Sequence, residues 1–497
     1  MSNRFQLHAI FSEGMILQRN QENPVWGTGP DGMQLTLECQ GHQVQTISAG
    51  GKWQGILPAF EAGGPHILTI SSEGRQLATV SDVYFGDVWL AGGQSNMEWK
   101  VRDTSHAQAD IAEANFPLIR YFEVPKVEWE DPTVETPMIA SWNKALPEHV
   151  PDFSAVAYHF AQHIHASEGI PVGIIGCNWG GTSAACWVSE STIHQHPELE
   201  VYLDTFAEEM KDFDWVAFES VQRSYDQATA DYEKRKAAGA TPEELGGYPW
   251  PPPMNPHNPM RPCGIYETML LKIVPYGLKG FLFYQGESDA GRAELYDKLL
   301  TGLIHEWRSL WHNDQLPFHF VQLTSFCSDG KPDGETWPLL RESQAIVNER
   351  VPHTGMAITL DCGERDDIHP RDKRTVGQRL ALTALEHVYG KELTSSGPVY
   401  RELNIEGGRI VLHFDHTDGG LGLPVGSEQL IGFQIAAEDG NFLKAEASIV
   451  GKTVEVWHPE ITKPAKARYA WTNYTEANLV NGLGLPAGTF RTHVTRE

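Results

Sequence analysis

The chain opens with period-two alternation of apolar and polar residues, interrupted by glycine-rich breaks such as Gly50-Gly51. Leu35, Leu37 and Cys39, for example, share one face of a candidate strand. Alternation of this kind between turn residues is typical of strands with one buried face. We therefore predict a small all-β unit over residues 1–82.

The pattern changes near residue 83, where short, wholly apolar runs begin to alternate with helical patterns. The runs are 83–91, 119–124, 170–177, 280–284, 318–323 and 356–360. Between them, apolar residues recur at helical spacing, as in Leu295, Leu299 and Leu303. Buried strands alternating with helices predict an α/β domain over residues 83–394, with a mostly parallel sheet covered on both faces.

One stretch of this domain, residues 205–262, breaks the alternation. Residues 205–238 are charged and amphipathic, and residues 239–262 contain eight prolines. We interpret the stretch as an insertion that consists of helix followed by a proline-rich loop. Long loops in compact domains serve as lids or are surface excursions, and the sequence leaves both open.

The β signature returns over residues 395–497. Ile410, Leu412 and Phe414 alternate with polar residues, as do Val454 and Val456. A second β-rich segment is therefore expected at this end. The pattern alone does not decide whether the two β-rich ends pack together or stay separate.

Composition narrows the choice of partners. The 497 residues carry 65 acidic and 38 basic side chains, a net charge of −27. Nucleic acids and anionic membranes would be repelled, and no apolar run approaches the ~18 residues of a membrane helix. The six cysteines form no CxxC pair, which favours free thiols. The first residues lack an apolar signal region, so we expect a cytoplasmic protein, or an extracellular or periplasmic one if a leader has been removed.

Two motifs follow predicted strands and can supply a nucleophile and an anion site. Gly92-Gly93-Gln94-Ser95-Asn96-Met97 places a serine on a tight turn just after the run that ends at residue 91. Gly176-Cys177-Asn178-Trp179-Gly180-Gly181-Thr182 follows the run 170–177. Paired glycines let backbone N–H groups approach a developing negative charge. Either motif alone is also compatible with an ordinary polar turn.

Two further motifs complete the set. Tyr284-Gln285-Gly286-Glu287-Ser288 offers an amide donor at Gln285 and a carboxylate at Glu287. Asp366-Asp367-Ile368-His369-Pro370 places two carboxylates beside a histidine, which they can hold in one tautomer. Because ligands bind at the carboxyl ends of the strands in an open α/β sheet, all four motifs are expected to meet.

The four motifs together resemble the ordered blocks of SGNH hydrolases, in particular the sialate O-acetylesterases and their acetylxylan esterase relatives. The matching blocks are 93–97, 179–182 followed by Trp187, 284–288, and 367–370 with Lys373 and the helix after it. The stretches 9–19, 261–269 and 483–492 extend the resemblance over nearly the whole chain.

The resemblance implies a flavodoxin-like three-layer α/β/α core with an accessory, jelly-roll-like β-sandwich, which we expect the two β-rich ends to form. It also implies a serine esterase that removes acetyl groups from a sugar. Its expected roles are catalytic for Ser95, His369, Asp367 and Asp366, oxyanion-binding for Ser95, Gly180, Gly181 and Gln285, and substrate-binding for Gln94, Asn96, Trp179 and Glu287. The choice between Asp366 and Asp367 stays open, with a slight preference for Asp367.

In this mechanism Ser95 attacks the acetyl carbonyl while His369 takes the proton, so neither a metal nor an organic cofactor is expected. His159, His163 and His165 could ligate a metal, but a polar helix face is the commoner arrangement. Trp99, Trp179, Trp187 and Trp250 either stack on a sugar or pack beneath the loops.

Three other questions stay open at this point. An inert core with sugar-binding β units is the main alternative to an enzyme, and a lipase-like SGNH enzyme is another. The acetyl carrier is a sialic acid or a xylan-type polysaccharide. A homodimer is also compatible with the sequence.

Overall fold

The computed structural model describes residues 4–130 and 138–493. At its centre lies a mostly parallel sheet in the order β10-β9-β11-β8-β12-β13-β14. The strands are β8 (Arg75–Gly93), β9 (Phe116–Glu123), β10 (Trp142–Ala145), β11 (Val172–Asn178), β12 (Gly280–Tyr284), β13 (Phe318–Val321) and β14 (Thr354–Ala357). Only β10 runs antiparallel to its neighbour on this path. Each apolar run of the sequence coincides with a strand to within a few residues, whereas β10 was not predicted.

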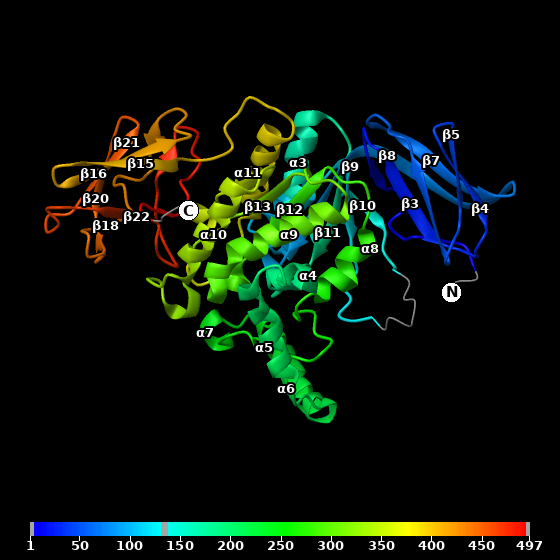
Figure 1. Cartoon of the computed structure of the whole chain (residues 1–497), viewed down its shortest axis with the longest axis horizontal. Coiled ribbons are helices and arrows are strands. Elements are labelled where there is room, and N and C mark those ends of the chain that lie inside the picture. The colour runs from blue at the N-terminus through cyan, green and yellow to red at the C-terminus, as the bar shows by residue number, and fades with distance from the viewer. Residues whose placement is uncertain (1–3, 131–137, 494–497) are drawn as a thin grey trace.

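Helices cover both faces of this sheet (Figure 1). On one face, Phe160 of α3 (Ala155–Glu168) packs against Trp89, with ring centroids 5.0 Å apart, and α11 (Lys373–His387) packs against α3. On the other, Trp307 of α9 (Tyr296–Leu310) contacts Phe283 at 5.6 Å, beside α10 (Thr336–Arg350). Because neighbouring residues of a strand point to opposite faces, both helical layers require apolar side chains, which explains the unbroken apolar runs. The three-layer α/β/α prediction is confirmed.

The N-terminal β unit is built on the same long strand as the core. Its first sheet contains β1 (Gln6–Leu7), β3 (Asn23–Thr28) and β6 (Lys52–Leu57). Its other strands are β2 (Ile16–Gln18), β4 (Gln34–Cys39), β5 (His42–Ile47) and β7 (Gly63–Ser72). Of these, β2 and β7 pair with β8, β4 pairs with β7, and β5 pairs with β4. The first part of β8 pairs with β7, and its last part pairs with β11 and β12. The predicted boundary between residues 82 and 83 therefore falls inside a continuous strand.

The C-terminal β unit has an apolar core of its own, formed around Ile410, Leu412, Phe433 and Tyr469. One sheet contains β15 (Val399–Glu406), β16 (Arg409–Asp415), β21 (Thr453–Trp457) and β20 (Glu446–Val450). The other contains β19 (Leu443–Lys444), β18 (Phe433–Ala436), β22 (Lys466–Tyr469) and β24 (Phe490–Arg491). A short pair, β17 (Leu421–Gly422) and β23 (Val480–Asn481), completes the unit.

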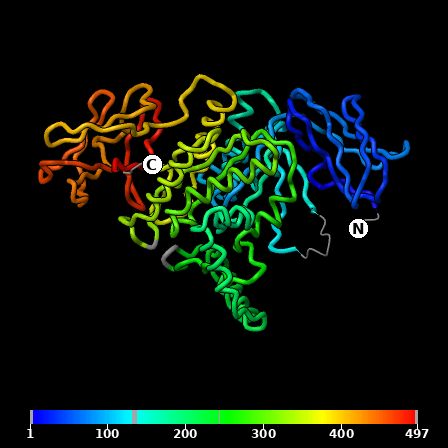
Figure 2. Tube along the Cα trace, in the orientation of Figure 1, coloured from blue at the N-terminus to red at the C-terminus, as the bar shows by residue number. Residues whose placement is uncertain are grey.

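The two β-rich ends lie on opposite sides of the α/β core (Figures 1 and 2). The expectation that they jointly form one sandwich is therefore corrected, since each end buries its apolar side chains separately. The N-terminal unit shares the main core through β8. The C-terminal unit is fixed by Arg341 of α10, whose buried guanidinium donates to the carbonyls of Ala470 and Thr472 at 3.0 and 2.6 Å.

The stretch 205–262 contains most of α5 (Glu200–Met210), all of α6 (Trp215–Ala237) and α7 (Pro242–Leu245), then a loop that returns to the core. Figure 1 shows α6 projecting away from the sheet, and none of its residues is buried.

The other helices of the core are short: α1 (Ser95–Glu98), α2 (Ala107–Ala112), α4 (Glu190–Ile193) and α8 (Leu271–Ile273). Over the described ranges, no helix has the length and apolar character needed to cross a bilayer.

Candidate active site

Three strands end at the same edge of the sheet, and a predicted motif follows each of them. Gly93, the last residue of β8, pairs with Asn178 of β11 and with Tyr284 of β12. Gly93 has φ +130°, and a Cβ there would lie 2.2 Å from the Tyr284 carbonyl oxygen. Only glycine fits this turn, which then places Ser95 at the start of α1. The expectation that these motifs meet is confirmed by the geometry.

Ser95 is in contact with the predicted base. Its Oγ lies 2.8 Å from Nε2 of His369, 274 residues further along the chain. The imidazole stacks on the indole of Trp99, with centroids 4.9 Å apart and planes inclined by 19°. This packing restricts rotation of the ring, so that Nε2 stays directed at the serine.

Asp367 is the carboxylate beside this imidazole. Its Oδ1 accepts the backbone N–H of His369 at 2.9 Å and lies 3.8 Å from the ring Nδ1. The second distance is too long for a hydrogen bond but short enough for electrostatic attraction. Asp366 is exposed and has no contact with the ring in the structure. Of the two carboxylates that the sequence left open, the geometry favours Asp367.

The imidazole is neutral at physiological pH. Burial, together with charge repulsion from Lys373, lowers the pKa of His369 to about 4, although Asp367 opposes the shift. A neutral imidazole whose Nε2 accepts the Ser95 hydroxyl carries its proton on Nδ1, facing Asp367. That tautomer is the one required of a general base.

Asn96 ties the serine loop to the histidine loop. Its side-chain N–H groups donate to Glu287 Oε1 at 2.5 Å and to the carbonyl of Ile368 at 3.0 Å. Its Oδ1 accepts a hydrogen bond from the ammonium of Lys373. Asn96 is only 1% exposed, so the amide sits inside the protein between the nucleophile and the base.

The partners of Asn96 are themselves buried ionisable groups. Desolvation raises the pKa of Glu287 and lowers the pKa of Lys373 to about 7. The Lys373 ammonium also lies over the rings of Trp99 and Tyr284, 5.9 and 5.6 Å from their centroids. The predicted substrate-binding roles of Asn96 and Glu287 do not match this burial, because both side chains are already used to position the loops.

The backbone around Gly180 and Gly181 borders the serine. A Cβ on Gly180 would lie 3.3 Å from Cβ of Ser95. The N–H of Gly180 is already donated to Glu98 Oε2 at 2.7 Å. Within the described part of the chain, the backbone N–H groups of Ser95 and Gly181 have no protein acceptor. They are the donors that remain for an oxyanion, whereas Gly180 does not fit that predicted role.

Gln285 also departs from its predicted oxyanion role. Its amide nitrogen is buried and lies within 2.6 to 3.2 Å of three protein acceptors, on Asp289, Gln94 and Thr182. Both of its hydrogens are therefore engaged within the protein. The side-chain oxygen of Gln94, Oε1, in turn accepts hydrogen bonds from the backbone N–H groups of Gly286 and Ser288. Gln94 is therefore a buried residue that positions this loop rather than a substrate ligand.

Sequence analysis did not single out Asp289. This buried carboxylate accepts four hydrogen bonds, from Ser183 Oγ, Tyr202 Oη, the Ala184 N–H and the Gln285 amide. It fixes the loop after β11 to the loop after β12. A carboxylate directly after the Gln-Gly-Glu-Ser block was the available signal.

The proline-rich loop forms one wall of the site. Gly181 has φ +79°, and a Cβ there would lie 2.2 Å from the Trp250 ring and 2.7 Å from Cε of Met260. Trp250 nevertheless remains 56% exposed. Trp179 is half-buried, with the Lys126 ammonium 5.2 Å from its ring centroid. Trp250 and Trp179 are thus accessible to a ligand, whereas Trp187 is fully buried and packs on Trp307.

Comparisons with known proteins find carbohydrate esterases. A family model described as carbohydrate esterase, sialic acid-specific acetylesterase matches residues 260–386. The solved structure of a carbohydrate acetylesterase from Xanthomonas citri is similar over 98% of this chain and 99% of its own, with 32% identity and a TM-score of 0.80. The chain belongs to this carbohydrate acetylesterase family.

Curated relatives of the family are more distant but similar over most of their length. The sialate O-acetylesterase of Mus musculus is 28% identical over 439 residues, which cover 81% of this chain and 77% of the mouse protein. That of Homo sapiens is 26% identical over 437 residues, 81% of this chain and 74% of the human protein. Membership makes the protein a carboxylic ester hydrolase.

Of the three histidines that could have ligated a metal, His159 is buried, and His163 and His165 are partly exposed. His159 Nε2 lies 3.3 Å from Asp110 Oδ2, and its Nδ1 contacts the Gln162 amide. Across the residues that the structure describes, no group of three or more metal-ligating side chains is present.

Asp367→Asn should lower kcat by at least about tenfold, toward the ~10⁴-fold cost of removing the aspartate of a serine-protease triad. The neutral amide can neither stabilise the imidazolium nor favour the Nδ1–H tautomer. The matched change Asp366→Asn should leave kcat within about twofold, since that carboxylate is exposed and away from the ring. Initial rates on 4-nitrophenyl acetate measure both variants, and a larger loss in Asp366→Asn would reverse the assignment.

The acid limb of activity should follow the depressed pKa of His369. The base works only when neutral, so kcat/KM should fall as pH drops through about 4. Lys373→Met removes a repulsive positive charge and should move this midpoint upward, whereas Lys373→Arg should keep it low. Circular dichroism at each pH separates titration from acid unfolding. A wild-type midpoint near the ordinary imidazole value of 6.5 would contradict the account.

Proposed function

We propose that this enzyme hydrolyses acetyl esters carried by a carbohydrate through an acetyl–serine intermediate. The observation that carries the proposal is the 2.8 Å contact between Ser95 Oγ and a neutral His369, next to two backbone N–H groups that have no acceptor among the described residues. A nucleophile, a base and anion donors are what acyl transfer requires.

Acylation begins when Ser95 Oγ attacks the acetyl carbonyl carbon and its proton passes to Nε2 of His369. The carbonyl oxygen becomes negative and is held by the N–H groups of Ser95 and Gly181. The loss of one such donor typically costs about 10²–10³-fold in rate. The tetrahedral intermediate then collapses, the bond from the acetyl carbon to the sugar oxygen breaks, and His369 returns the proton to that oxygen.

Deacylation repeats these steps with water. His369 removes a proton from the water as it attacks the acetyl–serine carbonyl, and the same two N–H groups hold the oxyanion. When the bond to Ser95 Oγ breaks, His369 returns its proton to the serine and acetic acid leaves. The second proton of the water departs with the acetic acid, which ionises to acetate in solution, so His369 and Ser95 end each cycle in their starting protonation states.

The surroundings of Ser95 favour a small acyl group. Trp250 and Met260 close over Gly181 on one side, and Trp99 stacks on the base. A long acyl chain would need an apolar groove, whereas the accessible rings of Trp250 and Trp179 are separated by polar backbone. Flat indole faces of this kind suit the C–H face of a pyranose.

Carbohydrate as the acetyl carrier is supported by the similarity to the Xanthomonas carbohydrate acetylesterase and to the mouse sialate O-acetylesterase. Sialic acid is one carrier within this proposal, and a xylan-type polysaccharide is the other. The alternative of an inert sugar-binding core is disfavoured by the assembled Ser95–His369 pair, since a binder gains nothing from a base aligned on a hydroxyl.

The proposal predicts rapid hydrolysis of 4-nitrophenyl acetate, slower hydrolysis of the butyrate and negligible hydrolysis of the octanoate. It also predicts acetate release from an acetylated xylan or from an O-acetylated sialic acid. Ser95→Ala should abolish both activities, while Ser191→Ala, which changes an exposed serine outside the site, should not. Activity that persists in Ser95→Ala would assign the nucleophile elsewhere, and preference for octanoate would indicate a lipase-like enzyme.

A further inference from the structure

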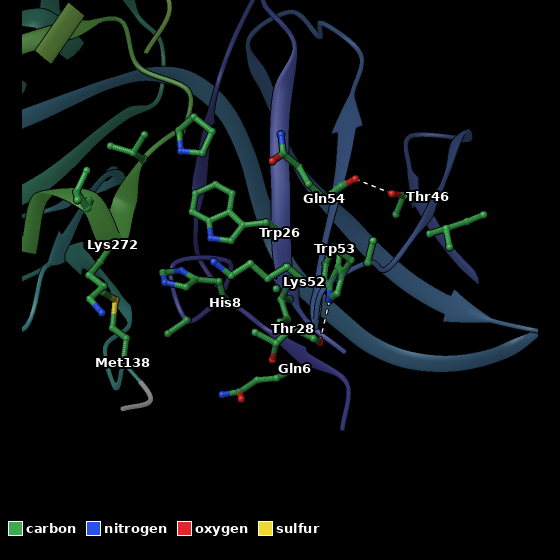
Figure 3. Close-up of a pocket in the computed structure, with 18 residues that line it drawn as sticks. Gln6, His8, Trp26, Thr28, Thr46, Lys52, Trp53, Gln54, Met138 and Lys272 are labelled. Carbon is green, nitrogen blue, oxygen red and sulfur yellow. Dashed lines mark hydrogen bonds between the residues drawn. The ribbon is translucent and has the colours of Figure 1, made fainter. Parts of the chain in front are cut away.

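A second hollow lies at the junction between the N-terminal β unit and the core, and its lining includes none of the residues assigned to the active site. Its volume is about 630 Å³, within the roughly 300–1,000 Å³ typical of small-molecule sites. One wall is the sheet formed by β1, β3 and β6, and the other includes Lys272 and Pro275 (Figure 3). We refer to it below as the junction groove.

The register of the sheet gathers polar and aromatic side chains on the wall of this groove. Trp26 of β3 lies opposite Gln54 of β6, and Thr28 lies opposite both Lys52 of β6 and Gln6 of β1. The residues between them point inward and are buried, as the alternating burial of β3 and β6 records. Because alternate residues of a strand share one face, these polar and aromatic side chains of β1, β3 and β6 all face the hollow.

Trp26 is the central aromatic side chain of the junction groove. Its ring meets the buried ring of Phe11 edge-on, with centroids 4.6 Å apart and planes at 88°, and remains half-exposed. Figure 3 shows Trp26, Lys52 and His8 close together in the middle of the groove. The His8 ring lies beside it, with centroids 5.4 Å apart. The exposed part of an indole held in this way is suited to contact with a sugar ring.

The charge of the groove is opposite to that of the protein as a whole. Its described lining contains two lysines and no carboxylate, in a chain of net charge −27. Lys272 is paired with Glu130. Lys52 has no carboxylate within ion-pair distance in the described structure, so its charge is available to an anionic ligand.

His8 adds a neutral donor. Burial, assisted by Lys272, lowers the pKa of His8 to about 4, so the ring is uncharged at neutral pH. Its Nδ1 accepts the backbone N–H of Ile10 at 3.4 Å, which leaves the proton on Nε2. Together with the amides of Gln6 and Gln54, this N–H can bind sugar hydroxyls.

We propose that the junction groove binds an acidic oligosaccharide, a chain of pyranose rings bearing carboxylates. Trp26 stacks on a ring, the amides and His8 bind hydroxyls, and Lys52 pairs with a carboxylate. The choice of a carbohydrate rests on the proposed function. The strand β8 leaves the β unit that carries the groove and ends beside Ser95, so a polymer held at the groove is tethered to the enzyme that deacetylates it.

The test is native affinity electrophoresis of the full chain in gels containing deacetylated glucuronoxylan or its carboxyl-reduced form, in which each carboxylate is replaced by a neutral hydroxymethyl group. Ser95→Ala serves as the reference protein and excludes any contribution from turnover. We expect retardation by glucuronoxylan, and weaker retardation by the reduced polymer. Adding Trp26→Ala should weaken binding by about tenfold or more, and adding Lys52→Gln should remove the preference for the acidic polymer.

Two controls make the result interpretable. Trp457→Ala removes a half-exposed indole from the C-terminal β unit and should leave retardation unchanged. Because Trp26 also packs on Phe11, Gln54→Ala provides a second groove variant whose exposed side chain does not support the core. It should weaken binding severalfold at an unchanged Tm.

The proposal is overturned if Ser95→Ala migrates normally in glucuronoxylan, or if neither Trp26→Ala nor Gln54→Ala alters its retardation. Equal retardation by the two polymers would overturn the claim that the ligand is acidic. When Ser95 is intact, the groove variants should hydrolyse 4-nitrophenyl acetate at the wild-type rate. Failure of that reaction in wild type would refute the esterase and leave the binding result standing, so the two claims fail separately.

Discussion

The buried amide of Asn96 is the interaction on which the active site depends. It is adjacent to Ser95 in sequence, and it donates to the carbonyl of Ile368, the residue before His369. Nucleophile and base are therefore held together by a shared side chain as well as by their own hydrogen bond. Removal of that amide would leave buried partners on Glu287, Ile368 and Lys373 unpaired, at about 1–3 kcal/mol each.

This arrangement also explains why ionisable groups are buried beneath a site that operates on a neutral ester. Lys373 supplies a positive charge close to His369, which keeps the imidazole neutral and able to accept a proton. Glu287 partly offsets that charge and holds the other end of the Asn96 amide. The cost of burying each group is met by hydrogen bonds within the same network. Further out, Asp289 and Gln285 fix the loop that carries Gly181 by the same means.

Much of the fold could be predicted from the sequence because the apolar runs of a doubly covered sheet are unambiguous, as in the run that became β12. The meeting of Ser95 with His369 also followed from their places after strands. The buried roles of Asn96, Gln94 and Glu287 could not, because a polar residue in a loop motif looks the same whether it faces a ligand or the interior. The expectation that the two β-rich ends pack together was wrong. The alternation that includes Ile410 and Leu412 shows that one face of a strand is buried, but it does not show which part of the chain covers that face.

The reactivity of Ser95 toward a small organophosphonate tests the role of Asn96 most directly, because this reaction needs an aligned base but no sugar. In folded Asn96→Ala, the second-order rate constant of inactivation should fall by about 10²-fold or more. Asn143→Ala, which changes a side chain that donates to the nearby Ser141 carbonyl, should react like wild type. A folded Asn96→Ala protein that is inactivated at the wild-type rate would show that Ser95 and His369 align without this amide, and the account would be contradicted.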